Sequence, residues 1–279
     1  SVMANNRFEG KIVLVTGSDS GIGQQVLLGF AKEGASVVIH GIDDGSLEET
    51  AGLLEKEGVN ESRYFKIKGL FENDKFIEEL MEKTIQRFGR LDILVNNAGL
   101  FKKPGLDSFK DSYEIENMDY LWKVNTRASF ALIELALPHL QKTKGCIINT
   151  CSIAGVDMVG KQIHVVAYAT SKSALLTLTR FQSVRCAPLG VRVNGVLPGI
   201  HDSPFMRKNF NDLKTEEDAR RYQAHVKNLV TRIPAGVLGQ VPNLVQSYLN
   251  LAASSYMNGA IWVQDGGRLY WASETEYLF

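Results

Sequence analysis

The chain has 279 residues, of which 44% are hydrophobic and 22% are charged, as is ordinary for a soluble globular protein. Lys plus Arg and Asp plus Glu number 31 each, so the formal net charge is zero and no nucleic-acid or membrane-surface partner is expected. No apolar run is long enough to cross a bilayer, and the N-terminus lacks the apolar stretch of a secretory signal, so a cytoplasmic location is expected.

Short β-branched runs alternate with amphipathic stretches along most of the chain. Strands are predicted over Lys11–Thr16, Ser36–His40, Arg63–Lys68, Leu91–Val95, Cys146–Thr150, Val191–Leu197 and Ile261–Val263. Helices are predicted over Gly23–Glu33, Ser46–Glu57, Asn73–Phe88, Ile115–Leu140 and Ala169–Ala187. This alternation predicts an α/β fold, a Rossmann-type doubly wound parallel β-sheet of about seven strands with helices on both faces.

No linker or change in composition divides the chain, so residues 1–279 are predicted to form a single domain. Regularity is weakest between Pro198 and Pro234, where apolar residues mix with many charges. A stretch of this length inside a compact domain is usually functional, so a substrate loop or lid with short helices is predicted at about residues 198–235. A contact between subunits explains the stretch equally well.

Cysteines and histidines give little sign of special chemistry. Cys146, Cys151 and Cys186 have no CxxC spacing, and their odd number argues against a disulfide framework. Cys151 could be a catalytic thiol, but an inert, half-buried residue is the favoured interpretation. The five histidines are scattered without ligand spacing, so no metal site is predicted.

A glycine-rich turn follows the first predicted strand, at residues 16–23 (TGSDSGIG). Glycines permit a tight turn there, and the unpaired N–H groups of the next helix start can bind a pyrophosphate. The place after the first strand is the context that a dinucleotide-binding turn requires. Contacts to a dinucleotide are therefore predicted from Gly17, Ser20, Gly21, Ile22 and Gly23. A purely structural glycine turn is the alternative.

Five ordered motifs resemble those of the short-chain dehydrogenase/reductase family. They are TGSDSGIG at residues 16–23, NNAG at 96–99, YATSK at 168–172, RVN at 192–194 with PG at 198–199, and DGG at 265–267. Several motifs in their proper strand and helix context are far more specific than any single one. The resemblance covers nearly the whole chain. It implies an oxidoreductase that uses NAD or NADP to transfer a hydride to or from an alcohol–carbonyl pair.

Tyr168 and Lys172 are four residues apart, so on a helix they project from the same face. The ordinary pKa of tyrosine, about 10, is too high for a base near neutrality, and a nearby ammonium lowers it. Tyr168 is therefore predicted to be the general acid of reduction and the general base of oxidation. The resemblance implies that Lys172 also holds the nicotinamide ribose.

Two further catalytic residues, Ser152 and Asn125, are implied by the resemblance. Ser152 follows the fifth predicted strand and would hydrogen-bond the substrate oxygen, while Asn125 would support a water relay to the lysine. Asn is unfavourable in a helix interior, which is consistent with a special role.

The chain departs from the family between its serine and its tyrosine. Ser152 lies sixteen residues before Tyr168, three more than the family usually shows. The extra residues fall within Val156–His164, where a bulged loop beside the substrate is expected. His164 could contact the substrate, or it could be an exposed loop histidine.

The end of the second strand normally distinguishes NAD from NADP, because an acid there pairs with free ribose hydroxyls and an arginine accommodates the extra phosphate. Ile42 stands where NADP-using relatives often have arginine, so NAD is favoured. Asp43 could bind the ribose or could be a solvated turn residue, and the sequence favours neither role over the other. Leu70 replaces the Asp usual near adenine, which favours apolar contacts there.

The remaining cofactor contacts are implied by the resemblance. Asn97, Ala98 and Gly99 would flank the cofactor, and Pro198 and Gly199 would border the nicotinamide. Tyr168 and Lys172 are included among the cofactor contacts.

The expected partner is a small-molecule alcohol or ketone, and Phe205, Met206 and Phe210 in the 198–235 segment hint at an apolar one. The alternative is a catalytically silent relative that binds dinucleotide as a sensor or scaffold. The resemblance implies a homo-oligomer, a tetramer. The aromatic C-terminal tail is consistent with burial against a neighbouring subunit or over its own pocket.

Overall fold

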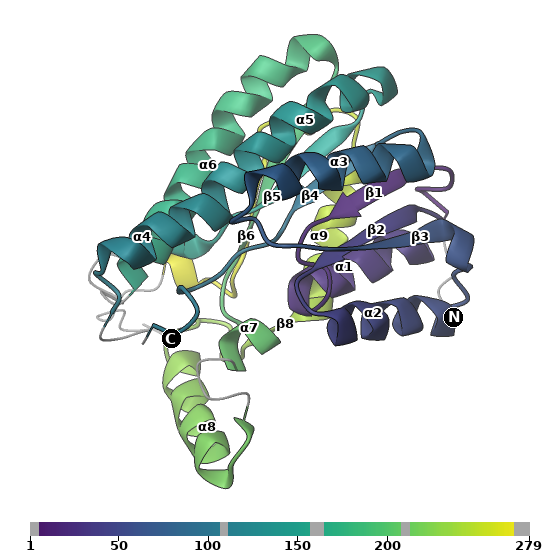
Figure 1. Cartoon of the computed structure of the whole chain (residues 1–279). Helices are drawn as coiled ribbons and strands as arrows, with labels where there is room; N and C mark the ends of the chain where they lie inside the picture. Colours follow the sequence, from purple (N-terminus) through teal and green to yellow (C-terminus); the bar gives the residue numbers. More distant parts are fainter. Residues whose placement is uncertain (1–5, 107–110, 157–164, 208–212, 271–279) are drawn as a thin grey trace.

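The computed structural model describes residues 6–106, 111–156, 165–207 and 213–270. Within them, seven parallel strands form one sheet in the order β3-β2-β1-β4-β5-β6-β9 (Figure 1). The strands are β1 (Ile12–Val15), β2 (Ser36–Gly41), β3 (Tyr64–Lys68), β4 (Ile93–Asn96), β5 (Cys146–Thr150), β6 (Arg192–Pro198) and β9 (Ile261–Gln264). The predicted Rossmann-type sheet is confirmed.

Helices cover both faces of the sheet (Figure 1). One face carries α1 (Gly21–Lys32), α2 (Asp44–Lys56) and α9 (Val241–Ala253), and the other carries α3 (Asp74–Phe88), α4 (Ile115–Trp122), α5 (Ala128–Thr143) and α6 (Val166–Cys186). In β1, Val13 and Val15 pack on the first face while Ile12 and Leu14 pack on the second. Burial on both faces is why inner strands such as β1 and β4 are almost entirely apolar. Among the helices of the described residues, none combines the length and apolar character that crossing a bilayer needs.

The predicted strands agree with the structure to within two residues at each end. The predicted helix Ile115–Leu140 is divided, because the π-helix η2 (Lys123–Arg127) separates α4 from α5. No helix was predicted over residues 241–253, where the structure has α9. Its buried residues Val241, Leu244 and Tyr248 recur at helical spacing, and a proline occupies its first turn.

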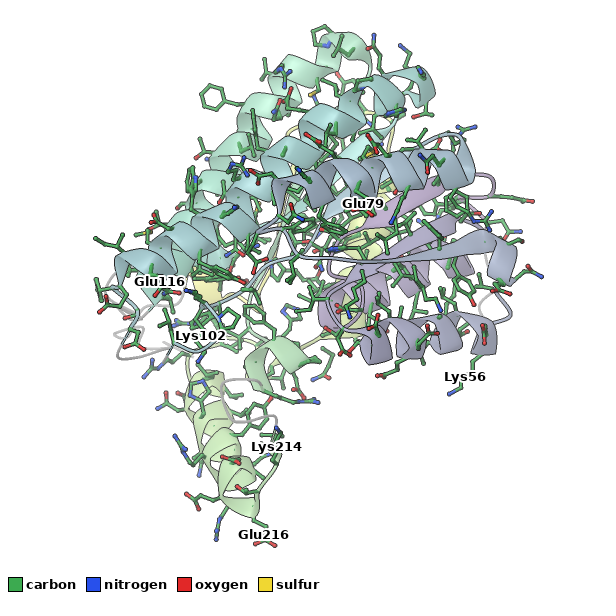
Figure 2. All side chains as sticks on the ribbon, in the orientation of Figure 1. Lys56, Glu79, Lys102, Glu116, Lys214 and Glu216 are labelled. Carbon is green, nitrogen blue, oxygen red and sulfur yellow. The ribbon has the colours of Figure 1, made fainter. Side chains whose placement is uncertain are left out.

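The segment at residues 198–235 contains short elements of its own. They are β7 (His201–Asp202), which pairs with β8 (Gly239–Gln240), together with α7 (Pro204–Arg207) and α8 (Glu216–Val230). Helix α8 extends away from the sheet, and Figure 2 shows Glu216 at its far end. Asp202 ties the segment together, since its Oδ1 accepts from Tyr222 Oη at 2.7 Å and from Arg207 Nη2 at 2.8 Å.

Candidate active site

The glycine-rich turn joins β1 to α1 at the point where the strand order reverses, between β1 and β4. Gly17 and Gly21 have φ angles of 62° and 58°, which favour glycine. A Cβ on Gly23 would lie 2.2 Å from the carbonyl oxygen of Gly17, so only glycine fits there. The side chain of Ser20, the N-cap, makes no capping hydrogen bond, and the first turn of α1 has no acidic residue. The amides at the helix start can therefore bind an anion, and the turn fits a pyrophosphate.

Asn97 and its neighbours fix this turn against the end of β4. Thr16 Oγ1 accepts from the N–H groups of Asn97 and Ala98, both at 3.0 Å. The Asn97 amide donates in return to the carbonyl oxygens of Thr16 at 2.9 Å and Gly17 at 3.0 Å. The predicted cofactor residues on the two loops are thus brought together.

Tyr168 and Lys172 lie on α6, and Ser152 follows β5. Lys172 is buried, and its Nζ donates to the carbonyl oxygen of Thr150 at 2.7 Å and lies 5.9 Å from the centroid of the Tyr168 ring. Ser152 Oγ accepts from Ala154 N–H at 3.1 Å, and the Ser152 side chain lies close enough to Tyr168 to act on the pKa of its phenol. The structure therefore brings together the serine, tyrosine and lysine that the sequence singled out.

Burial controls the ionisation of both α6 residues. It raises the pKa of Tyr168 to about 12, although the hydrogen bond with Ser152 acts in the opposite direction. It lowers the pKa of Lys172 to about 8. The expectation that the lysine would set a low tyrosine pKa is not met here, because desolvation of the phenolate is the largest effect. Tyr168 is consequently a phenol at neutral pH.

Asn125 lies in the π-helix η2, a feature that often marks functional sites. Its side chain is buried, with Oδ1 accepting from Leu100 N–H at 2.8 Å and Nδ2 donating to the Leu100 carbonyl oxygen at 2.9 Å and to Ser171 Oγ at 3.0 Å. A Cβ on Gly99 would lie 3.2 Å from both Asn125 Oδ1 and Lys172 Nζ. The predicted Asn125 therefore adjoins the lysine.

Two phenylalanines surround the tyrosine. The Phe101 and Phe205 ring centroids lie 5.2 Å and 6.0 Å from that of Tyr168 and 6.1 Å from each other. The sequence analysis singled out Phe205 but not Phe101. Phe101 lies two residues after the NNAG motif, and this position could have identified it. Together the three rings form an aromatic wall beside the phenol.

Pro198 and Gly199 stand at the carboxyl end of β6, as expected for residues near the centre of the site. The Gly199 N–H donates to the Gln264 carbonyl oxygen at 2.9 Å, and a Cβ on Gly199 would lie 2.5 Å from Asp265 Cβ. The PG motif therefore packs directly against the DGG motif.

Asp43 is the N-cap of α2. Its Oδ1 accepts from the N–H and the hydroxyl of Ser46, both at 2.9 Å, and these bonds lower the pKa of Asp43. The capping role corresponds to the turn-residue interpretation that the sequence left open. Ile42 and Leu70, exposed by 52% and 49%, lie just beyond the ends of the adjacent strands β2 and β3.

The remaining sequence predictions concern the Cys151 thiol, metal binding and residues that the structure does not describe. Cys151 is buried, which raises the pKa of its thiol to about 11 and favours the inert interpretation. Within the described residues, no group of three His, Cys, Asp or Glu side chains is arranged to hold a metal ion. His164, most of the inserted loop, Phe210 and the tail at 271–279 lie outside the described residues.

Comparisons with known proteins agree with this geometry. The family model of the short chain dehydrogenase matches residues 11–214, well over half of the chain. The uncharacterized oxidoreductase YhdF of Bacillus subtilis is 34% identical over 268 residues, covering 95% of this chain and 85% of the relative. The 3-oxoacyl-(acyl-carrier-protein) reductase FabG of Thermotoga maritima is 33% identical over 264 residues, covering 94% and 98%. The crystal structure of a short-chain dehydrogenase/reductase of unknown function from Caenorhabditis elegans, with cofactor, has a TM-score of 0.86 at 31% identity, covering 96% of this chain and 98% of that one. The chain therefore belongs to the short-chain dehydrogenase/reductase family and is an NAD(P)-dependent oxidoreductase.

Proposed function

We propose that this enzyme interconverts an alcohol and a carbonyl compound with NAD, using Tyr168 as the proton-transferring residue. The observation that carries the proposal is that Ser152 lies close enough to Tyr168 to lower the pKa of its phenol, with buried Lys172 on the same face of α6. All three side chains belong to the catalytic set that the motifs predict. No observation favours a silent relative that acts as a sensor or scaffold.

Each side chain has a distinct task. Ser152, oriented by Ala154 N–H, hydrogen-bonds the substrate oxygen. In reduction the Tyr168 phenol donates its proton to that oxygen, and in oxidation the phenolate accepts it. Lys172 is close enough for its ammonium to stabilise the phenolate. The bound nicotinamide supplies or accepts the hydride.

The cofactor would be held by the two loops at the sheet reversal and by the catalytic helix. Its contacts are Gly17, Ser20, Gly21, Ile22, Gly23, Asn97, Ala98, Gly99, Tyr168, Lys172, Pro198 and Gly199. Half-exposed Ile42 and Leu70 would give the adenine apolar contacts. The absence of arginine at position 42 supports NAD. Of the two roles that the sequence leaves open for Asp43, ribose contact or turn residue, the turn role is proposed, because its carboxylate caps α2 through Ser46. Asn125 would support a water relay to Lys172.

The substrate is proposed to be apolar, because the space beside the phenol is bordered by the rings of Phe101 and Phe205. An apolar surface of this kind favours an aliphatic or cyclic carbonyl compound over a heavily hydroxylated one, whose polar groups would lose hydrogen bonds to water there. The 198–235 segment would act as a lid on a single catalytic domain, and Phe205 is its contribution to the wall.

A homo-oligomer is supported by apolar side chains on the outer surface of α6. Phe181 and Val184 are exposed by 74% and 76%, and Trp122 of α4 and Phe130 of α5 are about half exposed. Large apolar side chains left exposed on helices that pack together commonly mark an interface between subunits. We propose that other copies of this chain cover these side chains, in a tetramer. The three cysteines are free and buried, which fits a reducing compartment such as the cytosol.

The test compares wild type with Tyr168→Phe and with Tyr64→Phe as a matched control. Tyr64 also carries a hydrogen-bonded phenol, but it belongs to β3. We expect Tyr168→Phe to lower kcat by about 10²- to 10⁴-fold. The Kd of NADH should change little, because phenylalanine keeps the ring with which residue 168 would contact the cofactor. Tyr64→Phe should keep its turnover. Full turnover in Tyr168→Phe would refute the proposal.

A further inference from the structure

The carboxyl end of β2 has no acidic or basic side chain at Gly41 or Ile42, although this is where a dinucleotide-binding sheet places the residue that distinguishes the two cofactors. Gly41 is not among the glycines with positive φ, so its backbone conformation is open to any residue. Lack of space, and not backbone conformation, must therefore explain the glycine.

That space is filled by Asp19 from the glycine-rich turn. A Cβ on Gly41 would lie 2.3 Å from each of Cβ, Cγ and Oδ2 of Asp19. The Ile42 N–H donates to the same Oδ2 at 3.1 Å. Asp19 therefore lies where the side chain of an acidic residue 41 would otherwise lie.

The position of Asp19 is fixed by the bonds on its N-terminal side. Ser18 N–H donates to the His40 carbonyl oxygen at 2.8 Å, and His40 N–H donates to Ser18 Oγ at 3.1 Å. These bonds join the turn to β2 one residue before Asp19 and one residue before Gly41. The carboxylate is thus held at the strand end by both chain segments.

We propose that Asp19 selects the cofactor, supplying from the glycine-rich turn the acid that β2 lacks. Its carboxylate would accept hydrogen bonds from the free hydroxyls of the adenosine ribose, and such charge-assisted bonds are strong. The additional phosphate of NADP would meet a like charge at the same place. The inference rests on the proposed function and assigns its NAD preference to one residue.

The charges around Asp19 are consistent with this assignment. Lys68 pairs with Gly41 in the register of β2 and β3, so it is the cation to which a phosphate could turn. Its Nζ lies 2.5 Å from Asp44 Oδ2, and Asp43 is the next acid along the loop. The Lys68 ammonium is therefore already paired with an acidic neighbour. The net charge around the strand end is unfavourable to the additional phosphate of NADP.

The experiment measures the Kd of NADH and of NADPH without substrate, by fluorescence titration, for wild type, Asp19→Asn and Asp43→Asn. Asp19→Asn preserves the shape of the side chain and an oxygen acceptor for Ile42 N–H but removes the charge. Asp43→Asn does the same at the cap of α2, where asparagine and aspartate serve equally well. We expect wild type to prefer NADH by about tenfold or more, and Asp19→Asn to reduce that preference by about tenfold or more. Asp43→Asn should preserve it. Thermal unfolding establishes that each variant is folded.

A double variant transfers the acid to the strand. Asp19→Gly vacates the space beside position 41, so Gly41→Asp can then be accommodated, and the double variant should regain a preference for NADH that Asp19→Gly alone has lost.

The outcomes separate the inference from the function beneath it. Equal affinity of wild type for both cofactors, or an unchanged preference in Asp19→Asn, overturns the role of Asp19 and leaves the oxidoreductase proposal standing. A preference lost only in Asp43→Asn assigns the role to Asp43 instead. A folded wild type that binds neither dinucleotide refutes the proposed function as well.

Discussion

Lowering the pH from about 7 to about 4 is expected to destabilise the enzyme through His40. This residue is 2% exposed, and its ring stacks on Phe71 at 4.6 Å between centroids. Nδ1 accepts from Gly17 N–H at 3.0 Å, and Nε2 lies 3.3 Å from the carbonyl oxygen of Gly69. The ring is therefore neutral with its proton on Nε2, because a proton on Nδ1 would face another donor.

The size of the effect follows from the pKa of His40. Burial lowers it from 6.5 to about 4. Between these values the unfolded chain binds a proton that the folded chain does not, so stability is fully present above pH 6.5 and is lost as the pH falls towards about 4. The gap corresponds to about 3 kcal/mol of unfolding free energy.

Urea unfolding at several pH values in this window measures the loss, with His40→Asn beside wild type. Asparagine offers an oxygen to Gly17 N–H but does not titrate. On acidification the unfolding free energy of wild type should therefore fall by about 3 kcal/mol more than that of His40→Asn. His139→Asn, which replaces a partly buried histidine on α5, serves as the matched control. A wild-type minus His40→Asn difference that is independent of pH would refute the reasoning.

Three further changes test other parts of the structure. Tyr222→Phe removes the 2.7 Å hydrogen bond to Asp202 that joins α8 to β7. We expect kcat/KM for the carbonyl substrate to fall several-fold, while the affinity for NADH, measured by titration, stays unchanged. An equal loss of NADH affinity would contradict the lid role. Phe181→Glu combined with Val184→Glu should lower the mass measured by light scattering to that of a monomer, whereas an unchanged mass would remove α6 from the interface. Cys151→Ala should retain most turnover, and wild type should resist iodoacetamide, because burial keeps the thiol protonated; loss of catalysis in a folded Cys151→Ala protein would restore the catalytic interpretation.

The sheet could be predicted because its inner strands are buried on both faces, so that strands such as β1 and β4 are almost continuous apolar runs in the sequence. The proximity of Tyr168 and Lys172 could be predicted because the two residues share α6, so their relation is local in sequence. The interruption of the long helix by η2 could not be located, since it is a change in backbone hydrogen bonding, although Asn125 in a helix interior was a sign of it. Helix α9 did leave a readable pattern of apolar spacing that the predictions did not use.

The relation between Asp19 and Gly41 could not be predicted, because it joins residues of two separate segments. Sequence patterning shows that a strand ends near Gly41, but it does not show which side chain fills the space beside a glycine. The predicted pKa direction of Tyr168 failed for a similar reason, since the extent of burial is a property of the packed structure. Both features depend on tertiary contacts.

The most direct test of the central claim follows a deuterium label. NADH deuterated at the transferable position is incubated with the enzyme and a panel of aliphatic and cyclic ketones, and the alcohol products are examined by mass spectrometry, with Tyr168→Phe in parallel. The account predicts that wild type places one deuterium on the former carbonyl carbon of at least one product. Tyr168→Phe should bind the cofactor equally well but form at least about 10²-fold less product. Transfer at the wild-type rate in Tyr168→Phe, or tight NADH binding by wild type with no label in any product, would contradict it.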